Sequence, residues 1–182
     1  MRIFGIDPGS QRTGYGCIDT DGSRHRMVAC GAVTVSTRIP FSDRLAGIFD
    51  ELAALLATHK PHCVAIEDVF FARNVKSALM LGHARGVAML AASKAGLSVT
   101  AYAPTEVKLA VVGYGRAEKL QVQQMLCLLL RLDIPPMPHD ASDALAIAVC
   151  HAHTTAGPAV MRPTSQPPAV RSWRQYRPAS RS

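Results

Sequence analysis

The sequence predicts an α/β protein in which a five-stranded mixed sheet carries helices on both faces. Three short segments rich in apolar and β-branched residues open the chain and are separated by turn signals. The apolar spacing then changes to that of a helix, and beyond it short apolar runs alternate with helical segments. A run of antiparallel strands followed by such an alternation is typical of a mixed sheet covered by helical layers.

The beginning of the chain predicts an antiparallel meander. Arg2–Asp7 is a short apolar run that Pro8-Gly9 ends, and Tyr15–Thr20 is a second strand. Asp21-Gly22-Ser23 is a hairpin turn signal, and Arg26–Val35 follows as a third strand. Because tight turns join antiparallel neighbours, we expect these three strands to lie side by side.

The next segment predicts a helix and then a parallel strand. Ser42 is a suitable N-cap for a helix that runs to about His59, and Lys60-Pro61 ends that helix. Cys63–Ile66 is a short apolar strand that ends on an acid. We expect the first strand to lie at the centre of the sheet, beside this strand and parallel to it.

The rest of the chain alternates helices and strands. We expect a helix over Val75–Ala95, a strand over Val99–Tyr102, a short helix from Thr105 that Gly113-Tyr114-Gly115 breaks, a helix over Ala117–Leu132, a loop over Ile134–Pro138 and a last helix from about Asp140 to His153. The helix over Val75–Ala95 carries apolar or small residues nearly all round, which is typical of a helix buried on more than one face. We therefore expect it to pack on the sheet and also to form a two-fold dimer interface.

Basic residues outnumber acidic ones, and the excess gathers near the end of the chain. The 182 residues include 20 Lys or Arg and 13 Asp or Glu, for a net charge of +7. The last acid is Asp143, and the segment beyond Thr154 is rich in Pro, Arg and Ser. We expect a folded domain over residues 1–154 and a disordered basic tail over residues 155–182. This charge favours a nucleic-acid partner, and Trp173 and Tyr176 suit either base stacking or a solvated tail.

The sequence argues against a membrane protein. Its apolar stretches fall short of the roughly 18–20 residues of a membrane span, and an acid follows the N-terminus too early for a signal peptide. We expect a cytoplasmic protein with reduced cysteines, because the five cysteines include no CxxC pair. His151 and His153 stand at the end of the last helix, where we expect capping or solvation.

Four acids carry the functional signal. Asp7 and Glu67 end two strands that we expect to be parallel neighbours, so both should emerge at one edge of the sheet. Asp140 and Asp143 are spaced i, i+3, which places both on one face of the last helix. If that helix packs against the first strand, the four carboxylates converge, and divalent cations such as Mg²⁺ would remove their repulsion. The predicted chemistry is metal-dependent hydrolysis of a phosphodiester by two ions ~3.5–4 Å apart.

Taken singly, these acids have structural interpretations. Asp7 before Pro8 suits a turn, Asp140 suits a helix N-cap, and Asp143 suits the first turn of a helix. Glu67 is harder to explain in this way, because it ends a buried apolar strand where an unpaired carboxylate is unfavourable.

Four segments of the chain carry motifs in a recognisable order. They are GIDPGSQRTGYG at Gly5–Gly16, AIEDVFFARNVKSALMLGHARGVAML at Ala65–Leu90, YAPTEVKLAVVGYGRAEKLQVQQML at Tyr102–Leu126 and HDASDALAIAVCHAH at His139–His153. Together they resemble the RuvC family of Holliday-junction resolvases, which implies an RNase H-like fold. The resemblance implies a catalytic metal site formed by Asp7, Glu67, Asp140 and Asp143 and holding two Mg²⁺ or Mn²⁺ ions. It also implies a homodimer that makes paired, symmetric nicks in a four-way DNA junction and works with a branch-migration motor.

The resemblance also points to residues that contact DNA. Phe70 matches a family aromatic that contacts unstacked bases, and Lys108 and Lys119 match basic residues close to the scissile phosphate. We take Lys119 as the catalytic candidate of the two. The DNA-binding candidates are Phe70, Phe71, Arg73, Asn74, Lys76, Lys108 and Arg116. Some family members have His in place of the third acid, so the role of His139, beside Asp140, stays open.

Three other functions are weighed against a junction endonuclease. The first is a non-catalytic junction-binding protein, which the four acids argue against, because binding DNA needs no cluster of negative charge. The second is another RNase H-like nuclease, acting on RNA or on simple duplex. The third is an actin-like ATPase, because Gly9, Gly14 and Gly16 surround a turn that could cradle phosphates; the chain is short for the duplicated domain such a cleft needs.

Overall fold

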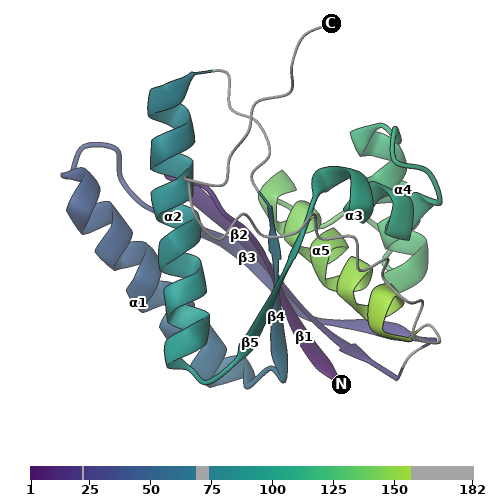
Figure 1. The fold of residues 1–182 in the computed structure, drawn as a ribbon. Helices are drawn as coiled ribbons and strands as arrows, with labels where there is room; N and C mark the ends of the chain where they lie inside the picture. The colour runs from purple at the N-terminus through teal and green to yellow at the C-terminus, as the bar shows by residue number, and fades with distance from the viewer. Residues whose placement is uncertain (22, 69–73, 157–182) are drawn as a thin grey trace, which may run out of the picture.

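The computed structural model describes residues 1–21, 23–68 and 74–156, and its core is one five-stranded sheet (Figure 1). The strands are β1 (Arg2–Asp7), β2 (Arg12–Thr20), β3 (His25–Thr34), β4 (Cys63–Glu67) and β5 (Ser98–Tyr102). Their order in the sheet is β3-β2-β1-β4-β5. β1, β2 and β3 are antiparallel neighbours, while β1, β4 and β5 run parallel. The predicted meander and the central place of β1 beside β4 are both confirmed.

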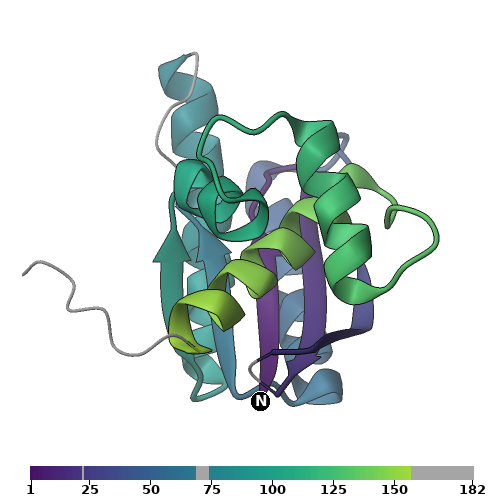
Figure 2. The same cartoon turned by 90° about the vertical axis from the view of Figure 1, so that its right-hand side faces the viewer.

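Within the described residues, five helices cover the two faces of the sheet. They are α1 (Phe41–His59), α2 (Val75–Lys94), α3 (Pro104–Val112), α4 (Lys119–Leu130) and α5 (His139–Ala156). α1 and α2 lie together on one face, and α3, α4 and α5 lie on the other (Figure 1). The view in Figure 2 shows α5 lying across the strands, with α3 and α4 beside it. The predicted α/β class with helices on both faces is therefore confirmed. No helix of the described part is long and apolar enough to cross a membrane.

Alternation along β1 divides the interior into two cores. Phe4 and Ile6 pack with the α1 and α2 side, whereas Ile3 packs with α5 on the opposite side. Gly5 also faces α5, and a Cβ there would lie 2.0 Å from the carbonyl oxygen of Ala144. Because successive side chains alternate, Asp7 at the end of β1 belongs to the face that α5 covers.

Two local expectations were wrong. α1 begins at Phe41 after Pro40 rather than after a capping Ser42, whose hydroxyl instead donates to Asp43 at 3.1 Å. Pro40 has φ −51°, so its ring fixes the entry into the helix without a side-chain cap. β2 also begins earlier than expected, at Arg12, because the short turn after β1 lets pairing with β1 and β3 continue as far as Gly14 and Arg12 respectively.

The two histidines at the end of α5 are not solvated caps, contrary to expectation. His151 is buried, and its ring nitrogens lie 3.3 Å from Cys63 Sγ and 2.9 Å from the Tyr102 hydroxyl. His153 lies 3.0 Å from the ring of His25. The helix runs across the sheet to its last turn, so its end faces strands rather than water. Of the expected tail over residues 155–182, the part from residue 157 lies outside the described residues.

Candidate active site

Asp7 and Glu67 lie side by side at one end of the sheet. β1 and β4 pair in parallel, with Ile6 opposite Ile66, so each acid is the next residue of its strand. Ala65 precedes Glu67 by two residues and packs in the core under α5, so both carboxyl groups point to the α5 face. The two side chains lie within hydrogen-bonding reach of each other. The predicted pairing of strand-end acids is present in the structure.

Glycines bring the other two acids close to this pair. Gly14 lies opposite Asp7 in the β1–β2 ladder, and a Cβ at Gly14 would lie 2.0 Å from the carbonyl oxygen of Asp140. Gly16 is similarly close to Leu145 of α5, with 2.6 Å from a built Cβ to Leu145 Cγ. The glycines of the first motif therefore allow the helix backbone to touch the sheet. In this structure, Gly14 and Gly16 face a helix backbone, so the alternative role of these two glycines as a phosphate cradle has no geometric support.

The four acids share one electrostatic environment. Burial, and after it the nearby charges of Glu67, Asp143 and Asp140 in that order of effect, together raise the pKa of Asp7 to about 8. Burial also raises the pKa of Glu67. A half-buried carboxyl group that feels the charge of three others has no structural advantage in a folded protein, which favours a functional role for the cluster.

Basic side chains approach the acids from two sides. The ammonium group of Lys119, at the start of α4, lies 2.6 Å from a carboxylate oxygen of Asp143. Lys119 and Lys108 line a pocket of about 220 Å³ together with Glu67 and Asp143. On the other side, the guanidinium of Arg12 lies 3.5 Å from Asp140. The structure thus places both predicted lysines beside the acids, and it adds Arg12.

The donor set fits hard divalent cations, although the side chains are not arranged around one. Among the described residues, no three His, Cys, Asp or Glu side chains lie close enough together to hold an ion. Two of the acids are instead turned to basic partners, Asp143 to Lys119 and Asp140 to Arg12. Carboxylate oxygens are the ligands that Mg²⁺ and Mn²⁺ favour, and a cation would offset the repulsion that raises the pKa of Asp7. Binding would require Asp140 and Asp143 to exchange their basic partners for the metal.

The remaining predicted residues have mixed outcomes. Phe70, Phe71 and Arg73 lie outside the described residues. Asn74 caps α2, since its side-chain oxygen accepts a hydrogen bond from the Ser77 amide at 2.8 Å. Lys76 and Arg116 are exposed on the surface.

The positions of two further residues were not anticipated from sequence. His139 opens α5, and its Nδ1 lies 2.9 Å from the Gln123 side-chain amide. Arg85 of α2 was not predicted; its guanidinium donates to the Glu67 carbonyl at 3.1 Å and lies 3.1 Å from Asp68. Arg85 therefore ties α2 to the end of β4. The only sequence signal for it was a charged residue inside an otherwise apolar helix.

Comparison with known proteins matches both the motifs and the fold. The model of the family described as crossover junction endodeoxyribonuclease RuvC matches residues 3–151. The RuvC endonuclease of Koribacter versatilis is 55% identical over 157 residues, covering 86% of this chain and 95% of the relative. That of Heliobacterium modesticaldum is 53% identical over 154 residues, covering 85% and 95%.

Solved structures agree with these relatives. Thermus thermophilus RuvC in complex with a Holliday junction substrate superimposes with a TM-score of 0.83 at 36% identity, covering 86% of this chain and 95% of that one. The yeast mitochondrial resolvase Ydc2 shares the fold, with a TM-score of 0.65 at 12% identity. The chain therefore belongs to the RuvC family of crossover junction endodeoxyribonucleases, which are metal-dependent nucleases with an RNase H-like fold.

Proposed function

We propose that this protein resolves four-way DNA junctions by paired symmetric nicks, using Asp7, Glu67, Asp140 and Asp143 to hold two Mg²⁺ ions, for which Mn²⁺ can substitute. The observation that carries the proposal is the meeting of four acids at one end of the sheet, where Asp7 and Glu67 end neighbouring parallel strands and the start of α5 lies against Gly14, opposite Asp7. Three separate elements, β1, β4 and α5, bring these groups together. A relative of the same fold has been solved with a Holliday junction substrate, which supports the choice of DNA structure.

Each residue has a distinct task in this mechanism. When bound, the cations would activate the attacking water and stabilise the leaving oxygen. Asp7 and Glu67 supply oxygen ligands from two adjacent strand ends, which hold them rigidly. Lys119 now pairs with Asp143; once that acid turns to a cation, the ammonium group is free to stabilise negative charge on the phosphate. Lys108 lines the same pocket and contacts the DNA backbone.

The segment between β4 and α2 supplies base contacts in this proposal. Glu67 ends β4 and Val75 begins α2, so Phe70, Phe71 and Arg73 lie between the acid cluster and the second helix in sequence. An exposed aromatic there would stack on bases that are unpaired at the centre of a junction, a contact worth ~1–3 kcal/mol per base. The DNA-contacting surface would also include Asn74, Lys76 and Arg116.

The homodimer forms through α2 in this proposal. The side of α2 turned away from the sheet carries Val75, Leu79 and Leu90, whose side chains are 77%, 58% and 49% exposed. Gly82 and Gly86 lie on the same side with open space around them, so a second helix can approach closely. The buried side of the same helix consists of alanines that face the sheet. A two-fold dimer through this stripe would give each of two junction strands its own active site.

The dimer is tested by the mass in solution. Leu79→Glu combined with Leu90→Glu should convert a dimer into a monomer, measured by light scattering at micromolar concentration. Leu109→Glu is the matched control, because Leu109 is 57% exposed on α3, on the opposite face of the sheet. A wild-type monomer, or a double variant that stays dimeric, would overturn the α2 interface.

The proposed activity is tested by cleavage of a synthetic four-way junction in Mg²⁺. Wild type should nick two opposing strands at symmetric positions, and Asp7→Asn should bind the junction without nicking it. Asp50→Asn, an exposed acid on α1, is the control and should nick like wild type. Binding without nicking by wild type would favour a junction-binding protein, and preference for duplex or RNA–DNA hybrid in competition would favour another RNase H-like nuclease.

Two associations complete the proposal. A resolvase needs junctions that are formed and moved by other proteins, so we expect it to work with a branch-migration motor on the same DNA. Since its substrate is DNA, we expect it in the bacterial cytoplasm, where the chromosome lies.

A further inference from the structure

A polar pocket adjoins the acid cluster on the side away from Lys119. It has a volume of about 530 Å³, and its lining includes Gln11, Arg12, Ser36, Thr37, Arg38 and Asp140. It lies where β2 begins and β3 ends, since Arg12 pairs with Thr34 in the sheet. Asp140 is shared between this pocket and the acid cluster, while Asp143 is shared between the cluster and the lysine pocket. The acids therefore lie between two pockets that carry basic side chains.

Hydrogen bonds hold the turn between β1 and β2, which leads into this pocket at Gln11 and Arg12. Gly9 and Thr13 exchange hydrogen bonds across the turn after β1, with 2.8 Å from the Thr13 hydroxyl to the Gly9 carbonyl. The buried guanidinium of Arg44, from α1, donates to the carbonyl of Ser10. The Val35 amide donates to the Gln11 carbonyl at 3.0 Å, which ties the two walls together. A rigid frame of this kind holds a ligand at a fixed distance from the acids.

The lining suits an anion. Two guanidinium groups, an amide and three hydroxyl-bearing residues line the pocket together with one carboxylate, that of Asp140. Arg12 is half-exposed, at 53% of its side-chain surface, and its 3.5 Å separation from Asp140 is long for a charged pair. Among the described residues, no carboxylate lies within ion-pair distance of Arg38. Guanidinium groups bind phosphate oxygens through paired N–H donors, and hydroxyls and amides add neutral contacts.

We propose that this pocket binds a backbone phosphate of the DNA strand being cut, next to the scissile phosphate and on the side away from Lys119. Arg38 and Arg12 supply the charged contacts, and Gln11, Ser36 and Thr37 supply hydrogen-bond donors. The strand then runs from the lysine pocket, across the four acids, to this pocket, which fixes the scissile bond between two held phosphates. The inference deepens the proposed function and rests on it.

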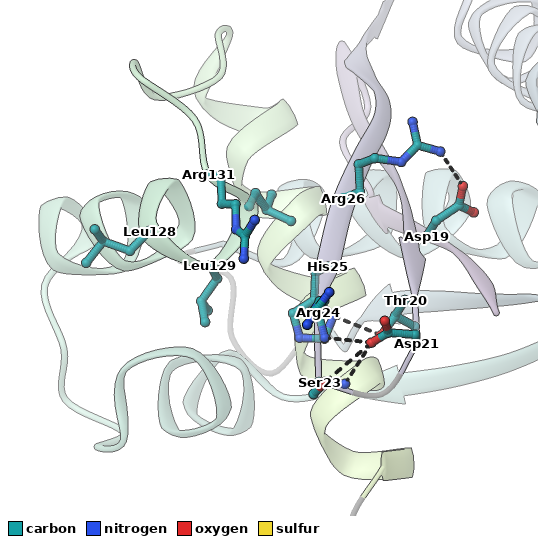
Figure 3. Close-up of a pocket in the computed structure, with 11 residues that line it drawn as sticks. Asp19, Thr20, Asp21, Ser23, Arg24, His25, Arg26, Leu128, Leu129 and Arg131 are labelled. Carbon is teal, nitrogen blue, oxygen red and sulfur yellow. Dashed lines mark hydrogen bonds and ion pairs between the residues drawn. The ribbon is translucent and has the colours of Figure 1, made fainter.

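A larger pocket at the other end of the sheet also carries arginines, but it lies away from the four acids (Figure 3). It measures about 790 Å³ and lies between the β2–β3 hairpin and the end of α4. Arg2 pairs with Asp19 at this end of β1, whereas Asp7 pairs with Gly14 at the other, so this pocket is remote from the acids. Arg26 lies 2.9 Å from Asp19, so part of its positive charge is already neutralised. Arg24 in this pocket provides a matched control for Arg38.

The first test compares the salt dependence of junction binding by wild type, Arg38→Gln and Arg24→Gln, in Ca²⁺ to prevent nicking. Arg38→Gln should bind about tenfold more weakly and flatten the plot of log K against log salt by ~0.9. Arg24→Gln should keep the wild-type slope. An unchanged slope for Arg38→Gln, or equal flattening by both variants, would overturn the proposal.

The second test identifies the phosphate. A neutral methylphosphonate is placed, one position at a time, at each phosphate flanking the nick, and binding by wild type and Arg38→Gln is compared. At one position, the methylphosphonate should weaken junction binding by wild type as much as Arg38→Gln weakens it on unmodified DNA. Binding by Arg38→Gln should not weaken further at that position. Parallel losses at every position would mean that no phosphate meets Arg38. Nicking of the unmodified junction by wild type is measured alongside, so failure of the proposed function is seen separately from failure of the pocket.

Discussion

Helix α5 carries polar groups at both ends against the same face of the sheet, and the two ends are satisfied very differently. At the C-terminal end of α5, His151 lies between the Cys63 thiol and the Tyr102 hydroxyl, and His153 lies between His25 and a backbone carbonyl. At its beginning, carboxyl groups meet other carboxyl groups. Both ends are closely packed on strands, so packing alone does not distinguish them.

The difference lies in what each polar group meets. Burial lowers the pKa of His151 and of His25, which favours their neutral rings, and each nitrogen of both rings lies within hydrogen-bonding distance of a protein partner. Burial and like charges raise the pKa of Asp7 to about 8, so at this end of the helix an unfavourable interaction remains that the pairing of Asp143 with Lys119 and of Asp140 with Arg12 does not remove and that an added cation would relieve. A buried polar group with protein partners stabilises the fold, whereas one without them indicates a ligand.

The largest expected effect is at Asp7. Asp7→Asn should lower the nicking rate by about 10³-fold or more, because it removes an oxygen ligand from the metal site. The same change should stabilise the metal-free protein. The folded-state pKa of Asp7 is raised from 3.8 to about 8, so this group's contribution to stability is lost as pH rises between those values.

The effect on stability is measured by urea unfolding at about pH 8.5 in EDTA. There the free energy of unfolding of Asp7→Asn should exceed that of wild type by on the order of 2–5 kcal/mol. Adding Mg²⁺ should raise the melting temperature of wild type more than that of the variant. Equal stability of wild type and Asp7→Asn at about pH 8.5 would contradict the unfavourable environment of the Asp7 carboxylate.

The second prediction tests whether the close packing of α5 against the sheet positions the acids, without changing any of the acids themselves. Gly14→Val should push the beginning of α5 off the sheet, since even a Cβ would lie 2.0 Å from the Asp140 carbonyl. We expect a loss of about 1–3 kcal/mol in stability and, because misplaced acids hold metal poorly, about 10²-fold in nicking rate. Gly47→Ala is the control: its Cβ would meet only Val35, at 3.5 Å. Normal nicking by a folded Gly14→Val would show that the close approach does not position the acids.

The sequence predicted the location of a site residue where that location follows from its position along one strand or helix. Strand ends located Asp7 and Glu67, because parallel neighbours end at the same edge, and the i, i+3 spacing located Asp140 and Asp143. Lys119 was placed by resemblance alone, and the structure brings it 2.6 Å from Asp143.

Contacts that depend on how α5 crosses the sheet were missed. Nothing in the local pattern shows that Gly14 faces the backbone of Asp140, or that His151 reaches Cys63 and Tyr102. These contacts join residues far apart in the chain, and they follow from the register and tilt of the helix rather than from any periodicity. The sequence shows Gly14 and Gly16, but only the structure shows that they are needed because α5 lies directly against them.

The third prediction addresses the satisfied end of α5. His151→Phe fills a similar volume but leaves the Cys63 thiol and the Tyr102 hydroxyl without their imidazole partner. We expect a loss of about 1–3 kcal/mol in stability with the nicking rate unchanged. His62→Asn is the control: His62 is exposed near the same strand and accepts from the Arg2 amide at 2.9 Å, and asparagine keeps an acceptor there, so stability should change by about 0.5 kcal/mol or less. A large drop in nicking by a folded His151→Phe would mean that the two ends of the helix are coupled.

The smallest expected effect is the pH dependence of the His25–His153 pair, and it has the opposite sign to that of the acids. Burial and then the nearby His153 lower the pKa of His25 below 6.5, and Asp21 opposes this weakly. The pair's stabilisation is therefore present above about pH 6.5 and is lost as pH falls through the lower folded-state pKa. To isolate it, unfolding is measured in the Asp7→Asn background with and without His153→Gln, so that the contribution of Glu67, whose pKa burial also raises, cancels in the comparison. Between about pH 7 and pH 5, the protein with His153 should change in stability by about 0.5–1 kcal/mol less favourably than the protein with His153→Gln. If His153→Gln left the pH dependence unaltered, the imidazole contact would not be the source of it, and only the acid end of α5 would respond to pH.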